Sequence, residues 1–136
     1  MTAANVLLRL VEAGAILWLD GDRLRFRAPR GTLGGDLDAR SRVCRPALVA
    51  LLRAGALLPP DLAAWPDDER ENYEERAGIR QFEGGLSREV AERKAERDVR
   101  LAHLRDFIAR NALVVEPPAG DAVAGTGQGT ARTGGP

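Results

Sequence analysis

The chain has 136 residues, with 20 Lys and Arg against 20 Asp and Glu, so its formal net charge is zero. This length suffices for one ordinary domain or two very small units, and the charge balance excludes a pervasive basic field for nucleic acid. Cys44 is the single cysteine, which excludes an intrachain disulfide and cysteine-based zinc motifs. No apolar run reaches the roughly 20 residues of a membrane span, and no signal-peptide pattern is present. We therefore expect a soluble cytoplasmic protein.

Charge is distributed unevenly along the chain. Residues 1–58 carry nine Arg against five acidic residues, whereas residues 59–116 carry nine Arg and one Lys against 14 acidic residues. Such asymmetry is typical of partner binding, although two solvated faces would give the same counts. Residues 117–136 hold six Gly and three Pro without an aromatic residue, so we expect a disordered tail over residues 113–136.

The first 56 residues have the pattern of a small α-β-β-α-α domain, which makes the chain α+β. Helical apolar spacing before Gly14 is followed by two short extended runs around Gly21-Asp22, a hairpin signal. Asp20-Gly21 is an alternative turn. The predicted elements are a helix ending near Gly14, strands over residues 15–20 and 23–28, and helices over residues 33–42 and 46–54.

Strand alternation gives this hairpin two unlike faces, whichever turn is used. One face is apolar and is expected to be core: Leu17, Leu19, Leu24 and Phe26. The other carries Ile16 and Trp18 with Arg23, Arg25 and Arg27, and no acidic residue is interleaved. Stacking of arginine on an exposed indole is one interpretation. The other is a shallow site for an acidic, partly apolar peptide, bound by Arg–carboxylate pairs and by main-chain pairing at the hairpin edge.

The segment AILWLDGDRLRFRAPRG, residues 15–31, resembles the core signature of the β-hairpin docking domains of the tubulysin-synthetase type, which begin nonribosomal peptide synthetase and hybrid synthetase subunits. LLRLVEAG before it and CRPALVALLRAG after it are also similar to that family, so the resemblance covers roughly residues 3–55. It implies an α-β-β-α-α fold, commonly dimeric, that captures the acidic C-terminal peptide of an upstream subunit as an added strand. The binding residues it implies here are Trp18, Arg23, Arg25, Arg27 and Arg30. We expect no condensation or adenylation domain to follow, and stand-alone proteins with this hairpin also resemble accessory proteins of phages and mobile elements.

The second half of the chain is expected to be helical. Residues 57–64 contain Pro59-Pro60 and read as a linker to a helical segment over residues 65–112. Its first helix is expected from Pro66 to about Arg80, and a long second helix from the N-cap Ser87 to Asn111, with ion pairs Glu89–Arg93 and Glu96–Arg100. We expect the acidic run 67–75 to contact the hairpin arginines and to compete with an external peptide.

No catalytic, cofactor or metal site is predicted. His103 is the only histidine, and neither Ser41 nor Ser87 lies in a nucleophile motif. We therefore expect a non-catalytic docking or adaptor module that binds an acidic peptide segment of another protein and forms a homodimer. One alternative is a phage or mobile-element accessory protein that binds nucleic acid or a host complex, which the zero net charge disfavours. Another is a homo-oligomeric helical scaffold built on the long helix.

Overall fold

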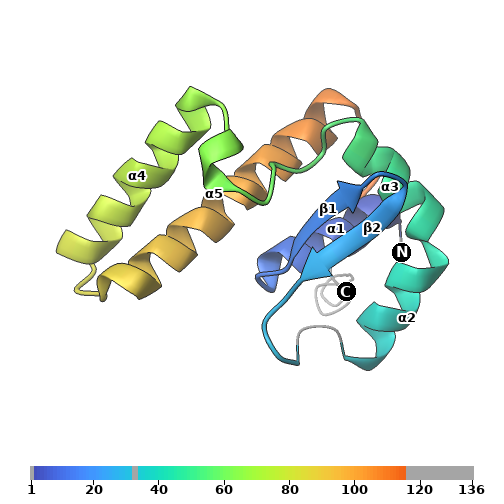
Figure 1. The fold of residues 1–136 in the computed structure, drawn as a ribbon, viewed down its shortest axis with the longest axis horizontal. Helices are drawn as coiled ribbons and strands as arrows, with labels where there is room; N and C mark the ends of the chain where they lie inside the picture. The colour runs from blue at the N-terminus through green and yellow to red at the C-terminus, as the bar shows by residue number, and fades with distance from the viewer. Residues whose placement is uncertain (1, 32–33, 116–136) are drawn as a thin grey trace, which may run out of the picture.

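A computed structural model of the chain describes residues 2–31 and 34–115. Its N-terminal part has the expected α-β-β-α-α order (Figure 1). Helix α1 (Ala3–Glu12) begins where the Thr2 hydroxyl accepts a hydrogen bond from the Asn5 amide at 3.1 Å. Strands β1 (Ile16–Asp20) and β2 (Arg23–Arg27) form an antiparallel hairpin, and helices α2 (Gly35–Val43) and α3 (Arg45–Arg53) follow. The expected start of α2 at residue 33 lies outside the described residues.

The hairpin turn is Gly21-Asp22, so the alternative turn at Asp20-Gly21 is wrong. Gly21 has a φ of +63°, as the first central position of a type II′ turn requires, and this turn matches the twist of paired strands. Trp18 stands opposite Arg25, and Leu17 stands opposite Phe26. This register confirms the division of the hairpin into an apolar and an arginine-bearing face.

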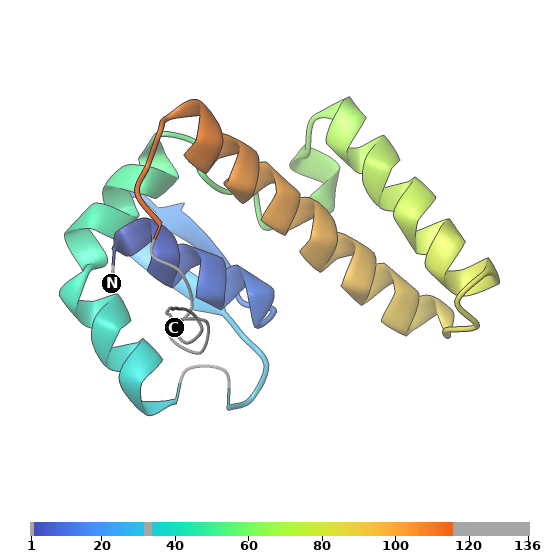
Figure 2. The same ribbon diagram turned by 180° about the vertical axis from the view of Figure 1, so that it is seen from behind.

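The second half forms an antiparallel helical pair, α4 (Asp67–Phe82) and α5 (Arg88–Arg110), preceded by the short 3₁₀ helix η1 (Leu62–Ala64). Both helices were expected, and α5 begins where the Ser87 hydroxyl accepts a hydrogen bond from the Val90 amide at 3.3 Å. In Figures 1 and 2, α4 lies along the first turns of α5, whereas the last turns of α5 reach the N-terminal part of the chain. No helix in the described part of the chain is both long enough and apolar enough to cross a membrane.

One apolar core joins the two halves. Leu104, Phe107 and Ile108 of α5 belong to the same buried cluster as Leu7 and Leu10 of α1. Beyond α5 the chain returns to α1, where the Thr2 hydroxyl donates a hydrogen bond to the Val114 carbonyl at 3.0 Å. Of the tail expected over residues 113–136, residues 113–115 are described in the structure, and residues 116–136 lie outside the described part. Independent folding of residues 1–56 stays a prediction.

The segment expected to be a linker, residues 57–64, is held by the buried side chain of Arg100, which is 5 % exposed. The guanidinium forms the expected ion pair with Glu96 at 2.9 Å and lies over the Trp65 ring at 5.0 Å. It also donates hydrogen bonds to three consecutive carbonyl groups of the segment, those of Leu58, Pro59 and Pro60. Burial lowers the pKa of Arg100, and the neighbouring Glu96 opposes that shift. These contacts hold α5 against the segment 57–64.

Candidate functional site

Four side chains on the exposed side of the hairpin form what we call the arginine face: Trp18, Arg23, Arg25 and Arg27. The Arg27 guanidinium lies 5.8 Å from the centroid of the Trp18 ring, so the stacking interpretation holds for this pair. Arg25 contacts Asp20 at 3.5 Å, with side chains 48 % and 64 % exposed. An ion pair so exposed contributes at most about 1 kcal/mol, which leaves Arg25 able to exchange Asp20 for a ligand carboxylate.

The arginine face is less uniformly basic than the sequence indicated. Asp20 stands opposite Arg23 and belongs to the same side of the sheet, so one acidic residue lies at the turn end of this face although none is interleaved among the arginines. Arg23 is exposed, and no described residue forms an ion pair or hydrogen bond with it. Arg30, the fifth residue that the sequence singled out, lies beyond the end of β2 on the segment that leaves the hairpin. It is exposed, but the strand register does not bring it onto the arginine face.

The outer edge of β2 is free for main-chain pairing. The described sheet contains two strands. In a hairpin with a two-residue turn, the residues that flank the turn exchange both hydrogen bonds, and the pairs alternate from there. Leu24 and Phe26 therefore direct their amide and carbonyl groups away from β1, and no described segment pairs with them. The edge of β1, in contrast, lies beside Leu57 and Leu58 of the segment held by Arg100.

The opposite side of the hairpin is only partly buried. Leu17 is 4 % exposed, but Phe26 is 54 % exposed, so the expectation that Phe26 belongs to the core is wrong. The physical reason is that the helices beneath the sheet leave a cavity at this end of β2. The cavity has a volume of about 180 Å³, and Phe26 lies at it together with Leu17, Leu24 and Leu48. An apolar surface is thus accessible along the free edge.

The α-β-β-α-α unit carries a free strand edge between the arginine face and an accessible cavity that is apolar on the side of the sheet. This arrangement is suited to holding an extended peptide. Residues 4–53 match the family described as the TubC N-terminal docking domain. The match agrees with the resemblance in the sequence and extends from α1 to the end of α3. We call residues 4–53 the docking segment. Comparisons with curated proteins and with solved structures gave no match.

The acidic run 67–75 does not lie against the docking segment in this structure. Its residues form the first turns of α4, where Asp67 pairs with Arg70 at 2.7 Å and Glu69 contacts the His103 ring at 2.8 Å. Between the run and the arginine face, the described residues form no ion pair. The expected internal competition is therefore not seen here.

Basic residues of α5 lie next to the docking segment instead. They were not among the site residues expected from the sequence. The expected Glu89–Arg93 pair is absent from the described contacts, and Arg88 pairs with Glu92 at 3.3 Å. Arg93 is left exposed, on the side of α5 that also carries Lys94 and Arg97. The i, i+1, i+4 spacing of these three cations places them on one helix face, and this is the signal that was available in the sequence.

Proposed function

We propose that the docking segment binds an acidic peptide of another protein as a third strand on the free edge of β2. The observation that carries this proposal is that the main-chain amide and carbonyl groups of Leu24 and Phe26 have no partner among the described residues. These groups lie between the arginine face and the exposed apolar surface. A peptide that pairs with this edge satisfies its own amide and carbonyl groups, so main-chain hydrogen bonds supply affinity and side chains supply specificity. The family match supports a non-catalytic docking role.

The two sides of the hairpin determine which residue types the peptide should carry at alternate positions. Side chains of an added strand alternate between the two sides of the sheet. Acidic side chains on one side would meet Arg23, Arg25 and Arg27, and apolar side chains on the other would cover Phe26 and enter the cavity beside it. The ligand is therefore a segment in which acidic and apolar residues alternate. The resemblance implies that this segment ends another synthetase subunit.

Charge reversal of the arginine face tests this proposal. The probe is a dye-labelled peptide of about ten residues, roughly 33 Å when extended, in which Glu alternates with Leu. R25E/R27E in the full chain should lower its affinity at least about tenfold, because two charge-assisted pairs are lost and replaced by repulsion. The matched control is R105E/R110E, which makes the same charge change at exposed positions of α5. Equal affinities of R25E/R27E and the control would overturn the proposal, provided that circular dichroism shows both variants folded.

The homodimer that the resemblance implies is a separate proposal. Light scattering of the full chain at several concentrations distinguishes a dimer from a monomer. A monomer over the micromolar range would refute it and leave the peptide site intact, since every residue of that site comes from one chain.

A further inference from the structure

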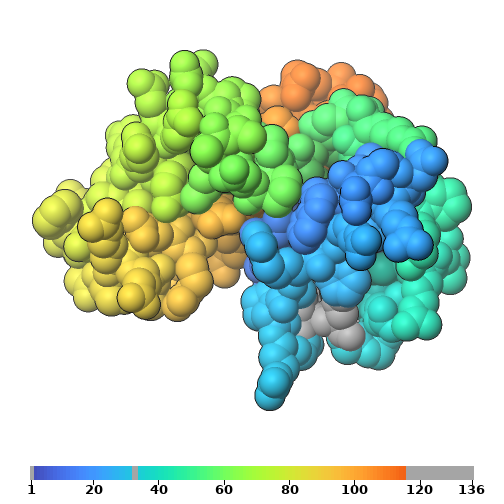
Figure 3. All heavy atoms as spheres, in the orientation of Figure 1, coloured from blue at the N-terminus to red at the C-terminus, as the bar shows by residue number. Residues whose placement is uncertain are grey.

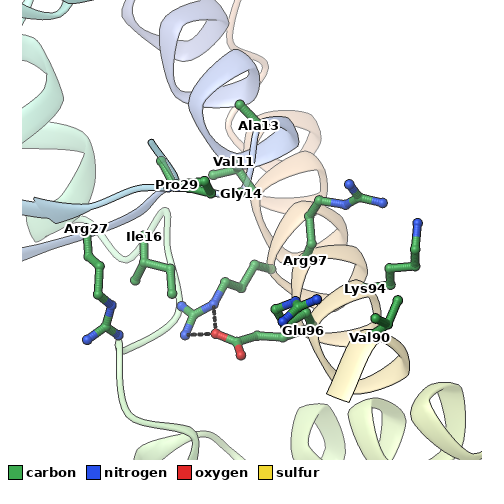
Figure 4. A pocket seen from close by; sticks show the side chains of 13 residues that line it. Val11, Ala13, Gly14, Ile16, Arg27, Pro29, Val90, Lys94, Glu96 and Arg97 are labelled. Atoms are coloured by element: carbon green, nitrogen blue, oxygen red, sulfur yellow. Dashed lines mark hydrogen bonds and ion pairs between the residues drawn. The ribbon is translucent and has the colours of Figure 1, made fainter. Parts of the chain in front are cut away.

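A second cavity lies between the end of the hairpin and the first turns of α5. It has a volume of about 480 Å³, and Figure 4 shows the residues that line it, with Arg27 and Ile16 on the hairpin side and Val90, Lys94 and Arg97 on α5. In the space-filling view of Figure 3, an open notch separates the blue segment after β2 from the gold turns of α5. We call this cavity the α5 cleft. The family match ends at residue 53, so the α5 cleft is only half formed by the docking segment.

Cations dominate the α5 cleft. Arg27, Arg93, Lys94 and Arg97 line it, and no described residue forms an ion pair with any of the four. Its one acidic residue is Glu96, which is paired with the buried Arg100 at 2.9 Å. The charge of Arg27 also contributes, after burial, to lowering the pKa of Arg100. An anion bound in the α5 cleft would be attracted by the cations that line it.

The α5 cleft also has an apolar part. Ile16 comes from β1, Pro29 from the segment after β2, and Val90 from the first turn of α5. A site for inorganic phosphate or another small polar anion would gain nothing from these side chains, whereas a peptide segment that combines carboxylates with an apolar side chain uses both parts. A volume of about 480 Å³ holds several side chains.

We infer that the α5 cleft is the second half of the docking site and binds the continuation of the same acidic peptide. This inference rests on the proposed function. Arg23, Arg25 and Arg27 follow one another along β2 at intervals of about 7 Å, and Arg27 lines both the arginine face and the α5 cleft. In this arrangement, the part of the peptide that extends past Arg27 lies in the α5 cleft, which Arg93, Lys94 and Arg97 also line. Helix α5 thus adds specificity to the docking segment by selecting ligands with acidic residues beyond the strand.

The test compares two labelled probes on the full chain. The short probe has about five alternating Glu and Leu residues, enough to cover β2, and the long probe has about ten. R93E/R97E should lower the affinity of the long probe about tenfold, the loss expected for two ion pairs reversed in sign, and should leave the short probe unchanged. R105E/R110E, with the same charge change farther along α5, should alter neither probe. R93Q/R97Q, which removes the cations without adding acids, is the second variant if circular dichroism shows R93E/R97E unfolded.

The outcomes separate this inference from the proposed function. If R25E lowers the affinity of both probes while R93E/R97E matches its control, the α5 cleft has no part in docking and the proposed function stands. If R93E/R97E lowers the affinity of the long probe but R25E does not, the peptide does not bind at β2. The proposed function and the inference of one continuous site then both fail. Displacement of the long probe by an equal concentration of a ten-nucleotide oligothymidylate would show a site for nucleic acid rather than for a peptide, and would overturn the inference. If neither probe binds, both proposals fail.

Discussion

Replacement of Phe26 by alanine should weaken peptide binding at least as much as it weakens the fold. Phe26 is 54 % exposed, and a phenylalanine side chain offers about 200 Å² for burial. An added strand that covers the exposed half removes about 100 Å² from water, worth about 2.5 kcal/mol at about 25 cal/mol per Å². Alanine retains the part of that area that belongs to Cβ. The expected loss of binding free energy is therefore about 2 kcal/mol, which raises Kd about thirtyfold.

The stability of the Phe26→Ala variant provides the comparison. The buried half of the ring contributes about 1–2 kcal/mol to the free energy of unfolding, whereas Leu17→Ala, at a position 4 % exposed, should cost about 2–5 kcal/mol. Fluorescence anisotropy with the alternating Glu–Leu peptide gives the affinity, and urea unfolding followed by circular dichroism gives the stability. Val43→Ala, at an apolar position 82 % exposed outside the cavity, is the control. An unchanged Kd for Phe26→Ala, or a loss of folding larger than that of Leu17→Ala, would refute the reasoning.

Three further predictions concern stability. Phe107→Ala should lower the free energy of unfolding by about 3–5 kcal/mol, because this ring lies in the core that α5 shares with α1; a loss below about 1 kcal/mol in urea unfolding would show that the two halves do not share that core. Burial first, and then the carboxylates of Glu92 and Glu96, raise the pKa of Tyr73 above its ordinary value of 10.0, so the unfolded chain loses this proton first and stability should fall as the pH rises from about 10. Tyr73 is the only tyrosine, and its ultraviolet titration should have a midpoint above that of the urea-unfolded chain; coincident midpoints would contradict this. Ala112 has a φ of 51°, which favours glycine, so Ala112→Gly should raise the melting temperature through a gain of up to about 1 kcal/mol, and a lower melting temperature would count against the described backbone.

Local patterns were enough to predict the hairpin. Alternation with a period of two fixes which side chains share a face, and the Gly21-Asp22 signal fixes the position of the turn to within one residue. The register of Trp18 opposite Arg25 requires the Gly21-Asp22 turn, which the sequence alone did not distinguish from Asp20-Gly21. Helix-capping signals such as Ser87 are equally local, and for this reason the sequence predicted the helices near their observed bounds.

Burial and proximity could not be predicted in the same way. Alternation places Phe26 on the apolar face, but whether a helix covers it depends on how α2 and α3 pack, and a cavity remains there. The placement of Arg27, Arg93 and Arg97 around one cavity depends on the position of α5. That position is set by the core that α5 shares with α1 and by hydrogen bonds from Arg100 to three carbonyl groups about 40 residues earlier in the chain. Contacts over such separations leave no periodic signal in the sequence.

The most direct test of strand addition is amide hydrogen exchange of the full chain with and without the alternating Glu–Leu peptide, resolved residue by residue. The amides of Leu24 and Phe26 face away from β1 and have no described partner, so both should exchange rapidly in the free chain and become protected when the peptide binds. The amides of Arg23, Arg25 and Arg27 already pair with β1 and should change much less. Saturating peptide that leaves Leu24 and Phe26 unprotected would contradict the account, because the peptide would then bind without pairing with β2.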